Sequence, residues 1–259
     1  MILAMDLDRT LIFSERFIKE HNNSFEDVEL VEEKDGKPIS YISKEVLNKL
    51  RELISIKDLT IVPITSRTLE ETYRIKFINM FKYIICDSGG MMIKNSTIVS
   101  EYDSYINSKN YREEMMELLM NIEELESVTY ARICDSRFIF GKTDNPNMFD
   151  LECQEICDKY TNFRINRVGN KWYAIPEHFN KAIALRFLMR MINDKTLIAS
   201  GDSLMDATML SIADYATVPD HGELVKDKIV LDGNIITGGI NSPLETFRLA
   251  EEIINKNKI

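Results

Sequence analysis

The chain has 259 residues, of which 44% are hydrophobic and 29% charged, a composition that excludes wholesale disorder. Acidic residues outnumber basic ones by 42 to 32, and the resulting net charge of −10 argues against nucleic acid as a partner. No apolar run reaches the roughly 18 residues of a membrane span, so no membrane partner is expected. The chain starts without a basic, apolar leader, and its four cysteines form no CxxC pair, so we expect a cytoplasmic protein with reduced thiols.

The first third of the chain alternates short apolar runs with helical patterns. Buried strands are predicted over 2–7, 59–64 and 83–86. Between the first two, residues 28–42 have the pattern of a hairpin, and Ser43 is expected to cap the helix that follows it. Strands that are nearly free of polar residues and alternate with helices predict a parallel sheet covered on both faces.

The middle of the chain has a different pattern. Two repeats of a helix followed by a hairpin are predicted, over 112–125, 128–140, 148–160 and 163–175. Strands at 196–200 and 215–218 then restore the helix–strand alternation. The predicted fold is therefore an α/β core with a doubly wound, Rossmann-like parallel sheet, formed by 1–88 and 177–259. A smaller α+β cap domain, residues 89–176, is expected to be inserted into it.

Carboxylates directly follow two of the predicted strands. Asp6 and Asp8 end the first strand in the run Asp-Leu-Asp-Arg-Thr, and Asp202 and Asp206 follow the strand over 196–200. Because ligands bind at the carboxyl ends of parallel strands, we expect these side chains to converge if the strands are neighbours. Clustered carboxylates repel one another unless a cation balances them, and a hard divalent ion, most simply Mg²⁺, is the natural choice.

The order and spacing of these motifs resemble those of the haloacid dehalogenase-like phosphatases. The run from Asp6 to Thr10 is similar to the first motif of that family, and Asp202 with Asp206 to the fourth. Thr65 resembles the hydroxyl residue of the second motif and Lys181 the lysine of the third. Three positions depart from the family pattern without removing a reacting group: Ser66, Ala182 and Met205. An α+β insertion between the second and third motifs resembles the branch that contains sucrose-phosphate and trehalose-phosphate phosphatases and phosphomannomutase.

The resemblance implies a Mg²⁺-dependent phosphoric monoester hydrolase. Asp6 would attack phosphorus and carry the phosphoryl group as an aspartyl-phosphate, and Asp8 would protonate the leaving oxygen and then accept a proton from water. The implied metal-binding residues are Asp6, Asp8 through its carbonyl, Asp202 and Asp206, where Asp206 would reach the ion through a water molecule or would orient Lys181. The implied phosphate-binding residues are Thr65, Ser66 and Lys181.

The expected substrate is a small phosphorylated metabolite, with a sugar phosphate as the first guess. Basic residues beside the site and on the predicted cap hairpins are candidates for holding it: Arg9, Arg67, Arg132, Arg137 and Arg167. Arginines on alternating strands are also typical of a solvated sheet face. The alternatives are a phosphomutase and a non-catalytic metabolite-binding module, and the complete set of reacting residues argues against the module. The hairpin over 28–42 is either a flap that closes over the substrate or a feature at the edge of the site with no role in binding. The sequence does not indicate the oligomeric state.

Overall fold

The computed structural model divides the chain into two units, residues 1–99 with 181–259, and residues 100–180. It describes residues 1–227 and 234–256, so the segments 228–233 and 257–259 of the expected core lie outside the described residues. Each unit has its own sheet and its own buried apolar cluster. An α/β core interrupted by an α+β unit, as predicted, is therefore the observed architecture.

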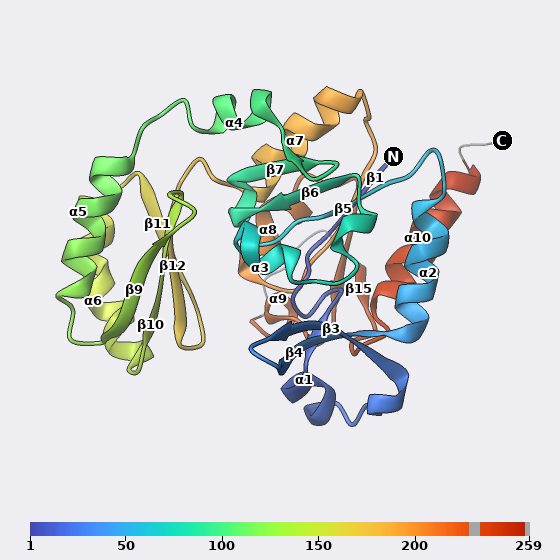
Figure 1. Cartoon of the computed structure of the whole chain (residues 1–259), viewed down its shortest axis with the longest axis horizontal. Coiled ribbons are helices and arrows are strands. Elements are labelled where there is room, and N and C mark those ends of the chain that lie inside the picture. The colour runs from blue at the N-terminus through green and yellow to red at the C-terminus, as the bar shows by residue number, and fades with distance from the viewer. Residues whose placement is uncertain (228–233, 257–259) are drawn as a thin grey trace. The chain divides into compact units, whose positions relative to one another are not determined.

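The first unit is built on a parallel sheet in the order β15-β14-β13-β1-β5 (Figure 1). Its strands are β1 (Ile2–Met5), β5 (Thr60–Pro63), β13 (Leu197–Ser200), β14 (Tyr215–Pro219) and β15 (Asn234–Ile236). β1 lies between β13 and β5 and pairs with both, so that Met5 lies opposite Ser200 on one side and Pro63 on the other. The residues that follow these three strands therefore emerge side by side at one edge of the sheet, where ligands bind in such folds.

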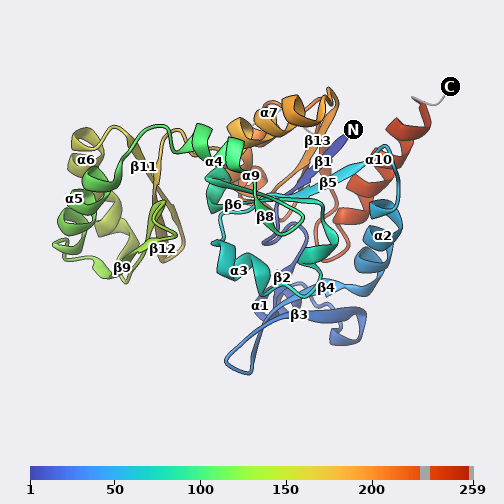
Figure 2. The same cartoon turned by 45° about the horizontal axis from the view of Figure 1, so that its top comes forward.

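Helices cover both faces of this sheet, as expected for a doubly wound fold. On one face α2 (Lys44–Ile54) packs beside α10 (Pro243–Lys256), and their buried side chains form one cluster with Leu3 and Met5 of β1. On the other face α7 (Lys181–Ile192) contacts α8 (Ala207–Leu210), which in turn contacts β13 and β14. Figure 2 shows the strands β13, β1 and β5 between α7 and the pair α2 and α10. The predicted cap of α2 is confirmed, because the Ser43 hydroxyl accepts from the backbone N–H of Val46.

The remaining helices of the chain are short or belong to the second unit. They are α1 (Glu15–Glu20), α3 (Leu69–Tyr73), α4 (Ser100–Ile106), α5 (Arg112–Glu123), α6 (Pro146–Lys159) and α9 (Glu223–Lys226). Within residues 1–227 and 234–256, no helix combines the length and the apolar character that crossing a membrane requires.

The third predicted strand, over 83–86, is not a full member of the parallel sheet. β6 (Tyr83–Cys86) makes one isolated parallel bridge, from Ile85 to Ile64 just after β5. It pairs antiparallel with β7 (Met91–Lys94), which pairs with β8 (Thr97–Ile98). A tight turn with positive φ at Asp87 and Ser88 sends the chain straight back. Residues 91–98 therefore belong to the sheets of the first unit, and the division between units falls at Ser100 rather than at residue 89.

The predicted hairpin after the first strand forms a small sheet of its own. It consists of β3 (Val28–Lys34) and β4 (Lys37–Ser43), with β2 (Phe13–Ser14) paired to β4. The pairing register shifts on both sides of Glu32, and consecutive residues Val31 and Glu32 are both buried. In a regular strand they would face opposite sides. This β-bulge therefore turns a charged side chain inward.

The second unit is a four-stranded antiparallel sheet covered by α5 and α6. Its order is β11-β12-β10-β9, with β9 (Val128–Cys134), β10 (Phe138–Thr143), β11 (Phe163–Val168) and β12 (Lys171–Pro176). Both predicted repeats of helix and hairpin are confirmed. Trp172 is fully buried and stacks on Phe149, with ring centroids 5.2 Å apart. A Cβ at Gly141 would lie 2.0 Å from the Trp172 ring, so a glycine is needed where the ring crosses the strand.

We expect Trp172→Ala to destabilise the second unit by about 3–5 kcal/mol, because it empties the largest buried side-chain volume of that core. Urea denaturation followed by far-ultraviolet circular dichroism measures the loss. Tyr130→Ala, on the 45% exposed β9 side chain, is the matched control and should cost about 1 kcal/mol or less. Equal losses in the two variants would contradict the assignment of Trp172 as the centre of this core.

Candidate active site

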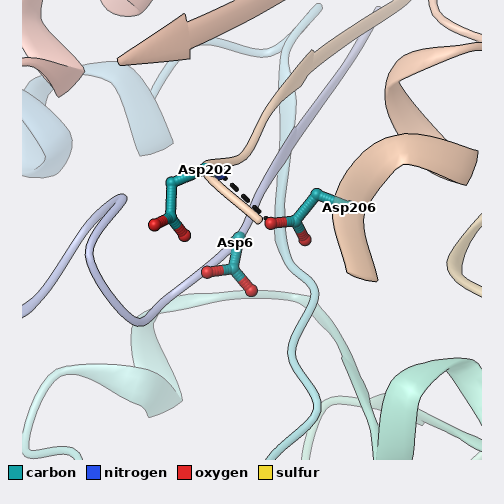
Figure 3. A group of neighbouring side chains, drawn as sticks. All are labelled: Asp6, Asp202 and Asp206. Atoms are coloured by element: carbon teal, nitrogen blue, oxygen red, sulfur yellow. Dashed lines mark hydrogen bonds between the residues drawn. The ribbon is translucent and has the colours of Figure 1, made fainter. Parts of the chain in front are cut away.

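Three buried carboxylates meet at the carboxyl ends of β1 and β13. Asp6 follows β1, Asp202 comes two residues after β13, and Asp206 ends the short helical turn Leu204–Asp206. One oxygen from each lies within 4.8 Å of the others, and Figure 3 shows the Asp6 carboxylate between the other two. Their exposed fractions are only 7%, 4% and 0%, respectively. The structure thus brings together three of the four carboxylates that were expected to converge, and the Asp8 side chain is not part of this group.

The spacing between Asp202 and Asp206 has a local structural cause. Oδ2 of Asp206 accepts hydrogen bonds from the backbone N–H groups of Asp202 and Ser203, at 3.1 and 3.0 Å, and from the Ser203 hydroxyl at 2.9 Å. A Cβ at Gly201 would lie 2.5 Å from the Cβ of Asp206. Asp206 therefore folds back under the end of β13, and only glycine at position 201 leaves room for it.

Lys181, the first residue of α7, is the cation at the centre of the cluster. Its Nζ donates to Oδ1 of Asp6 at 2.7 Å, to Oδ1 of Asp206 at 2.5 Å and to the carbonyl of Ile64 at 3.0 Å. These three bonds use all the donors of an ammonium group. Burial by itself would lower the pKa of Lys181, but the Asp206 and Asp6 carboxylates outweigh it and raise this pKa, so the group stays charged.

The three carboxylates of the cluster are paired with only two cationic side chains. One is Lys181, and the other is Arg9, whose Nε lies 3.1 Å from Oδ2 of Asp202. Burial, followed by repulsion from Asp206, raises the pKa of Asp6 well above its usual value although Lys181 opposes the shift. The same two causes raise the pKa of Asp202 to about 7, against the attraction of Arg9. A set of buried, all-oxygen donors that resists ionisation fits a hard metal cation.

Asp8 lies in a different environment from these three carboxylates. Its side chain is 52% exposed and is held by the Arg67 guanidinium, with Nε 2.6 Å from Oδ2 and Nη2 2.7 Å from Oδ1. Such a two-point contact fixes the plane of the carboxylate as well as its distance. Arg67 also donates to Glu32 and Ser40, so four hydrogen bonds in all hold it in place. The predicted contact of Arg67 with substrate stays a prediction.

The predicted phosphate-binding residues Thr65 and Ser66 follow β5, the neighbour of β1. Thr65 is 1% exposed; its backbone N–H donates to Ile85, and its Oγ1 accepts from the backbone N–H of Arg67 at 3.2 Å. Ser66 is partly buried. Because Lys181 binds the carbonyl of Ile64, the residue before Thr65, the ends of β1 and β5 and the start of α7 are linked around Asp6.

His221 is a residue of this region that sequence motifs did not identify. Its Nδ1 accepts from the backbone N–H of Gly239 at 2.9 Å, so Nε2 carries the proton and donates to the carbonyl of Arg9 at 2.7 Å. Burial lowers the pKa of His221, which keeps the ring neutral. Nη2 of Arg9 donates to the His221 carbonyl in return. This exchange holds Arg9 at its positive φ of 63°, beside Asp202. An isolated histidine in a loop carries no signal of such a role.

The other arginines predicted to contact substrate lie in the second unit. Arg137 donates to Asp103 and Asn107, and Arg167 makes a two-point contact with Asp150, at 2.8 and 2.6 Å. Arg132 is exposed on β9. Arg137 and Arg167 thus have partners within their own unit, and substrate contacts for all three arginines stay predictions.

Several solved structures share this fold. Sucrose-phosphatase from Synechocystis sp. PCC6803, solved with sucrose and phosphate, matches at a TM-score of 0.67 and 13% identity, over 96% of this chain and 97% of its own. A sugar phosphatase of haloacid dehalogenase subclass IIB matches at 0.66 and 14%, over 98% and 99%. Protein 0175 of Thermoplasma acidophilum matches at 0.65 and 18%, over 96% and 97%. At these identities the likeness establishes the fold alone.

Sequence comparison supplies the family. No curated protein matches the chain. The family model described as haloacid dehalogenase-like hydrolase matches residues 30–218, which is well over half of the chain. The fold and the motif residues gathered at its strand ends agree with that match, and the chain belongs to the haloacid dehalogenase-like hydrolase family.

Proposed function

We propose that this hydrolase is a Mg²⁺-dependent phosphatase that acts on a small phosphorylated metabolite, in the first place a sugar phosphate. The observation that carries the proposal is the environment of Asp6: a buried carboxylate, bound by Lys181 and placed beside two further acids. Two of the structures with the same fold are described as a sucrose-phosphatase and a sugar phosphatase, which supports the substrate class. A cytoplasmic location stays a prediction.

In the proposed reaction Asp6 is the nucleophile and Asp8 moves the proton. An oxygen of Asp6 bonds to phosphorus while the bond to the leaving oxygen breaks, and Asp8 gives that oxygen a proton. Water then attacks the aspartyl-phosphate, passes a proton to Asp8, and releases phosphate and the Asp6 carboxylate. The charge of Lys181 beside Asp6 would attract the phosphoryl oxygens, and Thr65 and Ser66 at the neighbouring strand end would bind them, since phosphoryl transfer depends mainly on position and charge.

The residues that would hold Mg²⁺ are Asp6, Asp202 and the carbonyl of Asp8. Asp206 has its Oδ1 bound by Lys181 and its Oδ2 by three further donors. Its proposed part is therefore to position Lys181 and the end of β13. When bound, the ion would balance the buried carboxylates and the charge of the phosphoryl group.

Phosphate release from a panel of phosphorylated metabolites and from p-nitrophenyl phosphate tests the activity. We expect turnover with Mg²⁺ and none with excess EDTA. Asp6→Asn should lower turnover by about a thousandfold or more, since the nucleophile is removed, while the circular dichroism spectrum is kept. Asp158→Asn, the same change at an exposed acid of the second unit, should leave activity unchanged. Full activity in Asp6→Asn would exclude the assigned nucleophile.

The raised pKa values predict how pH and metal affect stability. Between the ordinary aspartate pKa of 3.8 and the value of about 7 for Asp202, the folded chain binds more protons than the unfolded chain. Its metal-free free energy of unfolding should therefore fall as pH rises through that window, and Asp6 should act in the same direction. Mg²⁺ must displace protons at about pH 5 but few at about pH 8, so it should stabilise more at the higher pH.

Thermal unfolding with and without Mg²⁺ at the two pH values measures this effect. At a hundredfold excess over its dissociation constant the ion should add about 2.7 kcal/mol at the higher pH. Asp202→Asn should reduce both the pH dependence and the gain from Mg²⁺. A melting temperature that Mg²⁺ leaves unchanged at both pH values would show that the cluster does not bind it.

A further inference from the structure

Glu32 is a fully buried carboxylate that lies outside the acidic cluster, on the hairpin strand β3. Its Oε2 accepts from Nη1 of Arg67 at 2.8 Å and from the Ser40 hydroxyl at 2.8 Å, and its Oε1 accepts from Nε of Arg74 at 3.2 Å. Its exposed fraction is 0%. Burying a charge costs free energy that paired partners only offset, so a charge kept at this place calls for a reason beyond stability.

The backbone brings this charge inward by a specific irregularity. The bulge on β3 lets Val31 and Glu32 both face the interior, and the carbonyl of Val31 accepts from the backbone N–H of Lys76 at 2.8 Å. The next residue, Glu33, faces outward in an exposed contact with Lys76. Bulges of this kind commonly re-aim a side chain next to an active site.

Arg67 connects Glu32 to Asp8. Its guanidinium is planar, and one carboxylate binds each side of it: Asp8 takes Nε and Nη2, and Glu32 takes Nη1. Only 12% of the Arg67 side chain is exposed, so it is held in one orientation. Asp8 is half exposed, and the Arg67 contact described above limits the rotation that this exposure would permit. The orientation of Asp8 thus depends on Arg67, and that of Arg67 on Glu32.

We propose that Glu32 is a positioning residue of the active site, which acts through Arg67 to hold the Asp8 carboxyl group where it exchanges protons with the leaving oxygen and with water. This rests on the proposed phosphatase function. It also assigns a role to the hairpin β3–β4: around Glu32 the hairpin is a fixed wall of the site rather than a free flap. Small displacements of a catalytic group cost rate, because proton transfer requires hydrogen-bond distance to the reacting oxygen.

A purely structural ion pair predicts a different result from a positioning residue. If Glu32 only fastened the hairpin, its loss would lower stability and reduce the activity toward all phosphate esters by a common factor. If it positions Asp8, the loss must be larger for esters whose leaving oxygen needs the proton most. p-Nitrophenolate leaves readily without a proton, whereas phenolate is a poorer leaving group. The two esters therefore distinguish the roles.

The experiment compares kcat/KM of Glu32→Gln for phenyl phosphate and p-nitrophenyl phosphate, because this constant covers the steps up to departure of the leaving group. We expect a loss of about tenfold or more for the phenyl ester and of less than about threefold for the nitrophenyl ester, a fraction of the usual contribution of a general acid. Glu33→Gln makes the same chemical change one residue away, at an exposed position, and should alter neither value.

The second arm is a double-mutant cycle with Asp8→Asn. Once Asp8 cannot transfer a proton, Glu32→Gln should add little, and the two effects should be strongly non-additive. If Glu32→Gln fails to fold, Ser40→Ala, which removes one partner of Glu32, enters both arms in its place.

Each outcome has a distinct meaning. Equal losses for the two esters, or additive effects with Asp8→Asn, overturn the positioning role and leave the phosphatase proposal intact. A wild-type protein that releases no phosphate from any ester overturns both.

Discussion

The ammonium group of Lys181 is the interaction on which the rest of the site depends. It lies between Asp6 and Asp206 and also binds the main chain at the end of β5, so it connects three segments that are far apart in sequence. Without it, buried carboxylates within 4.8 Å of one another would repel at the ends of β1 and β13. A parallel sheet brings the strand ends together, but only a cation lets acids remain there. The fold supplies the position and Lys181 the charge.

The sequence predicted most of the core because its signals are local. Apolar runs identified β1, β5, β6, β13 and β14, and the helix–hairpin repeats identified the second unit. The short elements that close the first unit, such as β2, β7 and β8, were not predicted. They are two to four residues long, and the turn between β7 and β8 has positive φ at Asn95 and Ser96 rather than at a glycine. Patterns of hydrophobicity do not reveal such turns.

The residues of the site likewise divide into those that local sequence patterns predict and those that they do not. Asp6, Asp202 and Asp206 could be placed together from the sequence because the carboxylates directly follow buried strands, and parallel strands end at one edge. Glu32 and His221 could not. Whether Glu32 faces inward depends on a bulge that shifts the register by one residue, and a one-residue shift exchanges the two faces of a strand. His221 acts through its contacts with the backbone of Arg9 and Gly239, which lie 212 and 18 residues away. Long-range pairing of this kind is visible only in the folded chain.

Trp172 has a consequence of another kind. It is the only tryptophan of the chain, and its ring is fully buried in the second unit between Phe149 and the backbone at Gly141. The ten tyrosines are spread over both units. Indole emission excited selectively therefore reports on the second unit alone, without any added label. Tryptophan fluorescence therefore follows the unfolding of the second unit separately from that of the first, so the order in which the two units unfold can be measured.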